Sequence, residues 1–106
     1  MAKSKGNTEQ SLITILSAAR EAVFMRADTD GFRSLTDAEH VQADALMTVI
    51  ATAEPISRKD VAAQVAVSRE LIELVEHGLV GANRLELATV ALASASRMLA
   101  DRRRTA

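Results

Sequence analysis

The side chains that most often carry out acid–base chemistry are sparse in this chain. Its two histidines, His40 and His77, are far apart in the sequence and lack a spacing that would place both on one metal ion. His40 falls in the first turn of an expected helix, without an obvious acid–base partner. His77 falls at the end of another helix, where a cation complements the helix dipole, and Gly78 stops the helix there. The sequence therefore predicts no catalytic histidine.

The segment around Asp28, Asp30 and Gly31 is similar to part of a calcium-binding loop between two helices. In register with Gly31, however, the first ligand position is Arg26 and the closing glutamate is replaced by Asp37. An arginine at the first position removes a ligand and adds a repelling charge, so a solvated turn anchored by Phe32 or Leu35 is expected instead.

Other metal, cofactor and catalytic chemistry lacks its usual residues. The absence of cysteine excludes disulfides and thiolate metal sites, and the four glycines are scattered rather than gathered in a phosphate-binding loop. We predict no catalytic residues, no metal ligands and no cofactor-binding residues. The chain is expected not to be an enzyme.

The sequence contains four helix-start signals: Asn7 with Gln10, Thr36 with Glu39, Ser57 with Asp60, and Asn83 with Glu86. Apolar residues follow each of them at helical spacing. We predict an all-α fold, a small bundle of about four helices at residues 8–26, 36–53, 57–77 and 83–103. A flexible N-terminus at residues 1–6 precedes a single helical domain at residues 7–106. The inward face of the second helix is predicted to hold Val41, Ala45, Leu46, Val49, Ile50 and Ala53.

Composition is that of a small globular protein that benefits from association. Of the 106 residues, 48% are hydrophobic and 25% are charged, and Phe24 and Phe32 are the only aromatic residues. A core of small aliphatic side chains buries little area per residue, which favours close helix packing and oligomerisation. The net charge of −1 neither requires nor excludes nucleic acid as a partner. Without a membrane-spanning run or a secretory signal, a cytoplasmic protein of bacterial style is expected.

The last predicted helix is apolar on two sides. Alternating steps of three and four, as in a coiled-coil seam, connect Leu85, Ala88, Leu92, Ala95 and Leu99. A second apolar line includes Leu87, Val90, Ala91 and Met98. Such a helix has more to bury than one neighbour covers. The first set is therefore predicted to form an oligomer interface, and the chain to bind itself as a homodimer and another protein as well.

Residues 54–80 resemble the helix-turn-helix segment of DNA-binding proteins. The resemblance lies in the spacing of Ala62, Ala66, Val67, Ser68, Ile72 and Val75. It implies a break near Ala66 and a DNA-binding transcriptional regulator that uses residues 57–77. The residues that would contact phosphates or bases are Arg58, Lys59, Ser68 and Arg69. The pattern usually has glycine where this chain has Ala66, and the implied recognition helix presents Glu70, Glu73 and Glu76.

Two hypotheses follow from the sequence. The first is a small non-catalytic helical protein that acts as a homo-oligomeric regulatory or adaptor module through protein–protein association. It expects a continuous helix from about Arg58 to His77. The alternative is the DNA-binding regulator, which expects that helix to be broken near Ala66 and a DNA affinity that depends on salt.

Overall fold

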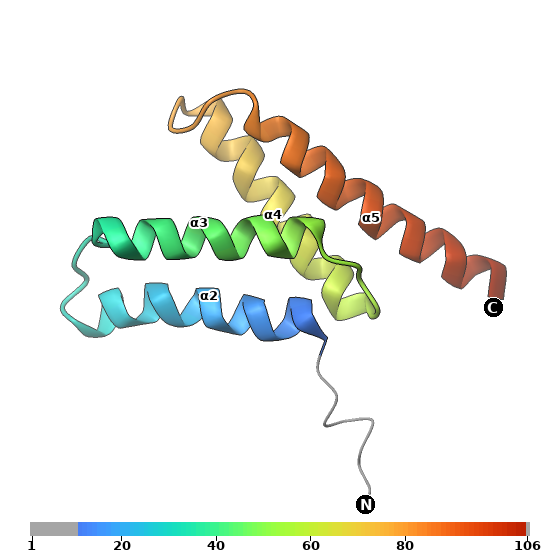
Figure 1. The fold of residues 1–106 in the computed structure, drawn as a ribbon, viewed down its shortest axis with the longest axis horizontal. Coiled ribbons are helices and arrows are strands. Elements are labelled where there is room, and N and C mark those ends of the chain that lie inside the picture. The colour runs from blue at the N-terminus through green and yellow to red at the C-terminus, as the bar shows by residue number, and fades with distance from the viewer. Residues whose placement is uncertain (1–10, 106) are drawn as a thin grey trace, which may run out of the picture.

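The computed structural model describes residues 11–105, with side chains described as far as residue 101. They form four α-helices: α2 (Leu12–Thr29), α3 (Asp37–Thr52), α4 (Arg58–Glu76) and α5 (Arg84–Thr105). Figure 1 shows these helices as a small bundle without strands in the described part of the chain. The all-α fold with four helices is therefore confirmed.

Two of the predicted helix starts are present as hydrogen-bonded caps. At α3, the Thr36 hydroxyl accepts from the backbone N–H of Glu39, whose side chain accepts from the Thr36 backbone N–H. At α4, the Ser57 hydroxyl accepts from the backbone N–H of Asp60. In both helices the cap satisfies a backbone donor that has no partner within the helix.

The first helix differs from its predicted bounds. Ser11 caps α2, and α2 continues past the expected end at Arg26 to Thr29. The predicted capping pair Asn7–Gln10 and the predicted flexible N-terminus at residues 1–6 lie outside the described residues. At the other end, Gly31 has a φ of +85° and provides the expected turn after the helix.

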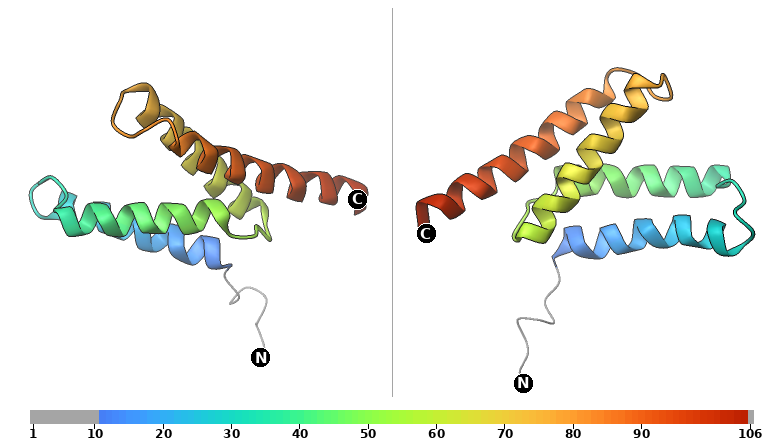
Figure 2. Two further views of the ribbon diagram at one scale, coloured as in Figure 1. Left: turned by 45° about the horizontal axis from the view of Figure 1, so that its top comes forward. Right: turned by 180° about the vertical axis from the view of Figure 1, so that it is seen from behind.

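The four helices form a thin bundle in which α3 and α4 occupy the centre. Figure 1 shows α3 in front of α4, with α2 along one edge and α5 along the other, and Figure 2 shows the same order from two further sides. Within the described residues α2 and α5 do not contact each other. The principal extents are 44 × 36 × 16 Å, and the radius of gyration is 15.5 Å. A compact domain of this length has a radius of about 13 Å, so this bundle is flatter than usual.

The core between the helices is small and rich in alanine. Six of the thirteen buried apolar residues in the described part are alanines. The central cluster contains Ile13, Met47, Ile50, Ala51, Val67, Leu71, Ala88 and Ala91. Small side chains let the helix axes approach closely but bury little area, as the composition predicts.

The predicted inward face of α3 is partly wrong. Val41 is 70% exposed and Val49 is 41% exposed, and Ala45 is exposed as well. Ile50 is buried as predicted, and the other buried residues of α3 are Ala43, Met47 and Ala51. The cause is the central position of α3, because α2, α4 and α5 together cover a stripe rotated away from the valines.

The third helix is continuous. α4 runs without interruption from Arg58 to Glu76, so the break near Ala66 that the helix-turn-helix resemblance implies is absent. Gly78, with a φ of +70°, follows the helix in the left-handed conformation typical of a helix end. Of the two alternatives for this stretch, the structure has the single helix.

Candidate protein-interaction surface

A strip of buried polar side chains on α4 connects this helix to each of its neighbours. Asp60, Gln64 and Ser68 are spaced four residues apart and are at most 1% exposed. The carboxylate of Asp60 accepts hydrogen bonds from the hydroxyls of Ser11 and Thr14 at the start of α2, the latter at 3.1 Å. It also accepts from the backbone N–H of Ile56 at 2.8 Å. Asp60 therefore fixes the start of α2 against the start of α4.

Gln64 connects α4 to the end of α3. Its amide nitrogen donates to the carbonyl oxygens of Ile50 at 3.1 Å and Ala53 at 2.8 Å. Carbonyls in the last turn of a helix have no partner within the helix, so Gln64 caps α3 from a neighbouring element. Its own Oε1 is buried without a hydrogen-bond partner among the described residues.

Ser68 connects α4 to α5. Its hydroxyl lies 2.9 Å from the carbonyl oxygen of Gln64 and 3.2 Å from that of Ala88 on α5. Because Ser68 is 1% exposed, it is not available to contact DNA, contrary to the helix-turn-helix alternative. This strip was not predicted from the sequence. The spacing of four residues between Asp60, Gln64 and Ser68 was the available signal.

A second polar link lies further along α4. Arg20 of α2 forms a bidentate ion pair with Glu70, in which the two terminal guanidinium nitrogens lie 2.9 and 2.6 Å from the two carboxylate oxygens. Its Nε donates to the carbonyl oxygen of Ala43 on α3 at 3.1 Å, and its guanidinium lies 5.1 Å from the ring centre of Phe24. One arginine thus joins three helices, and Glu70, which the alternative placed on a DNA-facing surface, is engaged within the fold.

The remaining predicted DNA-binding residues are on the surface of α4. Arg58, Lys59 and Arg69 are exposed, and Arg69 lies 3.9 Å from Glu73 in an ion pair. Glu76 is exposed on the same helix. This surface therefore carries both signs of charge, and the carboxylates reduce its net attraction for phosphates.

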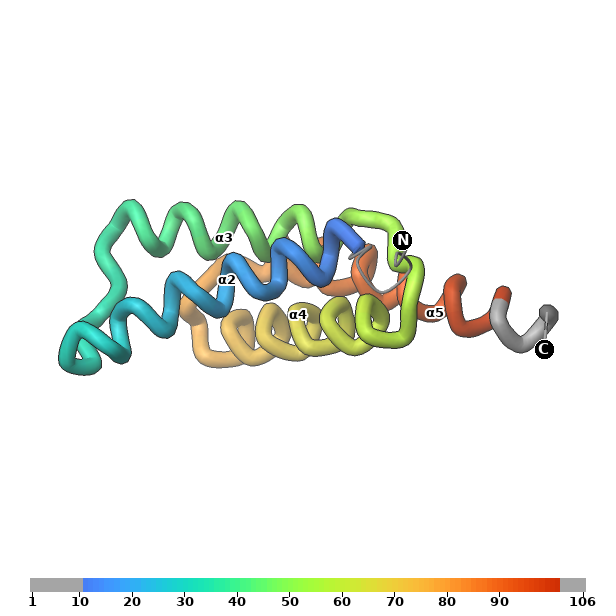
Figure 3. Tube along the Cα trace, turned by 90° about the horizontal axis from the view of Figure 1, so that it is seen from below, coloured from blue at the N-terminus to red at the C-terminus, as the bar shows by residue number. Residues whose placement is uncertain are grey.

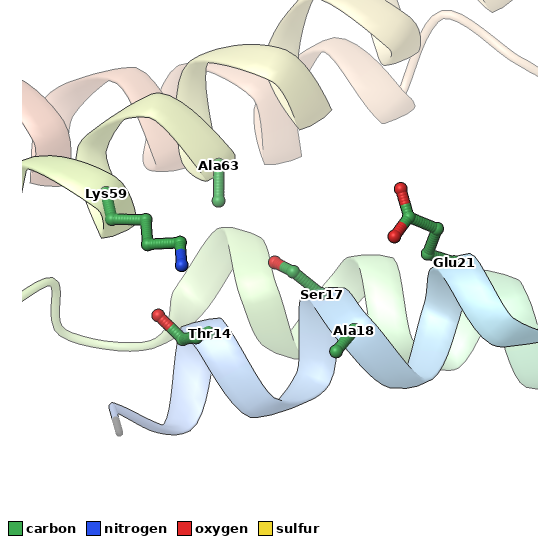
Figure 4. Close-up of a pocket in the computed structure, with 6 residues that line it drawn as sticks. All are labelled: Thr14, Ser17, Ala18, Glu21, Lys59 and Ala63. Atoms are coloured by element: carbon green, nitrogen blue, oxygen red, sulfur yellow. The ribbon is translucent and has the colours of Figure 1, made fainter. Parts of the chain in front are cut away.

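A shallow groove of about 360 Å³ separates α2 from α4. Figure 4 shows its lining residues, Thr14, Ser17, Ala18 and Glu21 on α2 and Lys59 and Ala63 on α4. Hydroxyls and an ammonium group face the opening, and the Lys59 side chain is exposed. The groove results from small side chains on two loosely packed helices.

The predicted oligomer interface on α5 is divided between the inside and the outside of the fold. Ala88 and Ala95 are each 3% exposed, so the chain's own packing covers them, and they are not available to a second copy. Leu85, Leu92 and Leu99 are 40%, 40% and 43% exposed. Their spacing of seven residues keeps them on one line along the helix.

The three leucines belong to a larger apolar surface that includes α4. The Ser68–Ala88 hydrogen bond fixes the register of the two antiparallel helices, which places Ile72 level with Leu85 and Val65 level with Leu92. Val65 is 44% exposed and Ile72 is 38% exposed. We call these five residues the α4–α5 face: Val65, Ile72, Leu85, Leu92 and Leu99.

The α4–α5 face lies on the outer side of both helices. On α4, Glu70 points to α2, and Val65 and Ile72 are on the opposite side of the helix. On α5, Val90 lines a pocket with Thr48 of α3, and the three leucines are on the opposite side. Figure 3 shows that the end of α5 projects beyond α4, so the last part of the leucine line extends past its neighbours.

The two histidines lie apart on the surface, and the segment that is similar to part of a calcium-binding loop forms a turn. His40 and His77 are exposed, and the ring of His77 contacts the carbonyl oxygen of Glu73 at 2.8 Å. Among the described residues no group of three or more His, Cys, Asp or Glu is arranged to hold a metal ion. The loop contains an ion pair between Arg33 and Glu39 at 2.7 Å instead.

The Arg33–Glu39 pair braces the turn between α2 and α3. The Arg33 guanidinium, with the backbone N–H of Thr36, lowers the pKa of Glu39 from 4.5 to about 2. The hydrogen bonds that Arg33 donates to Glu39 and Asp30 raise the pKa of Arg33. Both groups therefore stay charged over the whole physiological pH range.

Comparison of the chain with protein-family models, with curated proteins and with solved structures found no match. No helix in the described part is long and apolar enough to cross a membrane.

Proposed function

We propose that this chain is a non-catalytic helical protein that acts by association, with the α4–α5 face as its contact surface for a second copy. The observation that supports the proposal most directly is the line of Leu85, Leu92 and Leu99, each about 40% exposed beside the apolar side chains of α4. Exposed leucines that occur singly are normal on a protein surface, whereas an aligned set is typical of an interface.

The size of the face suits a small, weak dimer interface. The face runs from Leu85 to Leu99 and is therefore about 21 Å long at ~1.5 Å per residue. Two helices about 10 Å apart cover a width of about 20 Å, which gives ~420 Å². A standard interface buries about 800 Å² per partner. Burying the remaining exposed part of each leucine contributes ~1 kcal/mol, so we expect an association that varies with concentration.

Sedimentation velocity tests the proposal. The wild-type chain should sediment as an associated species whose mass rises with concentration. Leu92→Glu should weaken the association at least tenfold, because it removes an apolar contact and places a charge in the interface. Val90→Gln is the matched control, since Val90 is on the same helix, is 45% exposed and faces the other side. A folded Leu92→Glu chain with the wild-type mass at every concentration would refute the proposal.

The same measurement addresses the DNA-binding alternative. A mixed-sequence duplex is added at low salt, and the wild-type chain is compared with Arg69→Ala. A complex that dissociates as salt rises, and that Arg69→Ala weakens, would favour DNA as the partner. An associated species that is unchanged by the duplex would leave protein association as the function.

A further inference from the structure

The turn between α2 and α3 holds an aromatic side chain at the surface in an unfavourable backbone conformation. Phe32 has a φ of 58° and is 81% exposed. A bulky residue rarely adopts positive φ, and such strain persists where the surrounding structure imposes it, most often at binding and switch sites. A phenyl ring in water also gains nothing from the hydrophobic effect. Burial of the ring in a partner would offset both costs.

The turn that carries Phe32 is braced on both sides. The backbone N–H of Phe32 donates to the carbonyl oxygen of Asp28 at 3.1 Å, and that of Arg33 donates to the carbonyl oxygen of Ala27 at 3.1 Å. The Arg33 guanidinium binds both carboxylate oxygens of Glu39, at 2.7 and 3.1 Å. The ring is therefore presented by a fixed turn, which reduces the entropy lost when it binds.

A cleft of about 460 Å³ lies at the same end of the molecule. In Figure 1 this end contains both the turn between α2 and α3 and the turn between α4 and α5. The apolar side chains that line the cleft are Phe24, Leu35, Met47, Leu74, Leu79 and Val80. Leu79 is 71% exposed, so the cleft has an uncovered apolar lip. We call this hollow the end cleft.

The charges around the end cleft are paired with one another. Arg20 binds Glu70 at 2.6 Å, and Arg84 binds Asp44 at 2.7 Å. An uncharged ring that enters the cleft therefore leaves no charge without its partner. On the other side of the contact, the Arg33–Glu39 pair beside Phe32 is likewise complete. Both surfaces are suited to an apolar contact.

We propose that Phe32 of one copy inserts into the end cleft of a second copy, which inserts its own Phe32 in return. Since the ring and the cleft are at the same end of the chain, one two-fold rotation can form both contacts. Phe24 in the cleft wall offers the entering ring an aromatic neighbour. The end cleft is separate from the α4–α5 face, so a chain that uses both surfaces assembles beyond a dimer.

The test compares the masses of four chains by sedimentation velocity: wild type, Phe32→Asn, Leu92→Glu and the double variant. Asparagine tolerates positive φ, so Phe32→Asn removes the ring without straining the turn. Refractive-index detection is needed because the chain contains neither Trp nor Tyr. We expect the wild type to be larger than a dimer, each single variant to be a dimer, and the double variant to be a monomer.

A second variant tests the end cleft itself. Leu79→Lys places a charge on the lip of the cleft and should weaken the same contact by at least tenfold, as Phe32→Asn does. Met25→Asn, at a residue 58% exposed on α2, is the control and should leave the mass unchanged. Wild-type mass in Phe32→Asn would overturn the proposal. A reduced mass in Phe32→Asn together with wild-type mass in Leu92→Glu would retain the end cleft and refute the α4–α5 face instead.

Discussion

Replacement of Asp60 by asparagine is expected to destabilise the fold by about 2–3 kcal/mol. The carboxylate is fully buried and accepts from Ser11, Thr14 and the backbone N–H of Ile56. Asparagine keeps the shape but offers one acceptor oxygen. If that oxygen stays with the two hydroxyls, the amide group faces the N–H of Ile56, and two donors oppose each other. The variant loses the hydrogen bond from the Ile56 N–H to a charged carboxylate, and the loss of such a bond costs ~1.5–3 kcal/mol. The amide N–H group of the new asparagine is also left without an acceptor.

Urea unfolding followed by circular dichroism at 222 nm measures this cost. With a slope of about 1–2 kcal/mol per molar urea for a domain of this size, the unfolding midpoint should fall by about 1–3 M. The melting temperature should fall by about 10–20 °C. Protein concentration is held fixed, because the proposed self-association would add to the apparent stability.

Glu73→Gln is the matched control for Asp60→Asn. Glu73 is an acid on the same helix whose side chain is 59% exposed, so its replacement should change the unfolding free energy by no more than about 0.5 kcal/mol. If the two variants unfold at the same urea concentration, the buried carboxylate does not hold α2 to α4, and the assignment of the polar strip is refuted.

Two further predictions concern the turn and the core. Because the pKa of Glu39 is lowered to about 2 by Arg33 and Thr36, its ion pair stabilises the fold above pH 4.5 and is lost as the pH falls toward 2. Between pH 6 and pH 3 the urea midpoint should therefore fall further in the wild type than in Glu39→Gln, and equal falls would contradict the pairing. Leu71→Ala should cost about 3 kcal/mol because Leu71 is fully buried, whereas Val41→Ala, at a residue 70% exposed, should stay within about 0.5 kcal/mol. A large loss in Val41→Ala would restore the predicted inward face of α3.

Helix positions could be predicted from the sequence because their signals are local. Thr36 and Glu39 satisfy each other's backbone groups, and Ser57 satisfies that of Asp60, so neighbouring residues alone define where α3 and α4 begin. The end of α4 at Glu76 is local in the same sense, because Gly78, two residues on, adopts the left-handed conformation without steric cost.

The buried faces depended on tertiary structure and were predicted less well. Val41 and Val49 have the spacing of core residues, but the helices around α3 cover a different stripe. Asp60, Gln64 and Ser68 have the chemistry of surface residues, and they are buried because each finds a partner on another helix. A single sequence shows which apolar residues recur at helical spacing, but it does not show how many other helices pack around that helix.

The predicted oligomer interface on α5 also shows that burial could not be predicted from helical spacing alone. The sequence places Leu92 and Ala95 on one seam, and the structure puts the leucine outside and the alanine inside. A seam between two helices is narrow, so a small difference in rotation of α5 decides which of its edges is covered. That rotation is set by contacts with α3 and α4, which no local pattern records.

The contact between Asp60 and Ser11 has a consequence for the kinetics of folding. It joins residues 49 positions apart, whereas the α2–α3 and α4–α5 hairpins are formed by segments adjacent in the sequence. Closing the longer loop costs more chain entropy, so this contact is expected to form after the rate-limiting step. Interactions absent from the transition state act on the unfolding rate. The carboxylate at the start of α4 would then work as a latch that sets the lifetime of the folded chain and leaves the speed of folding almost unchanged.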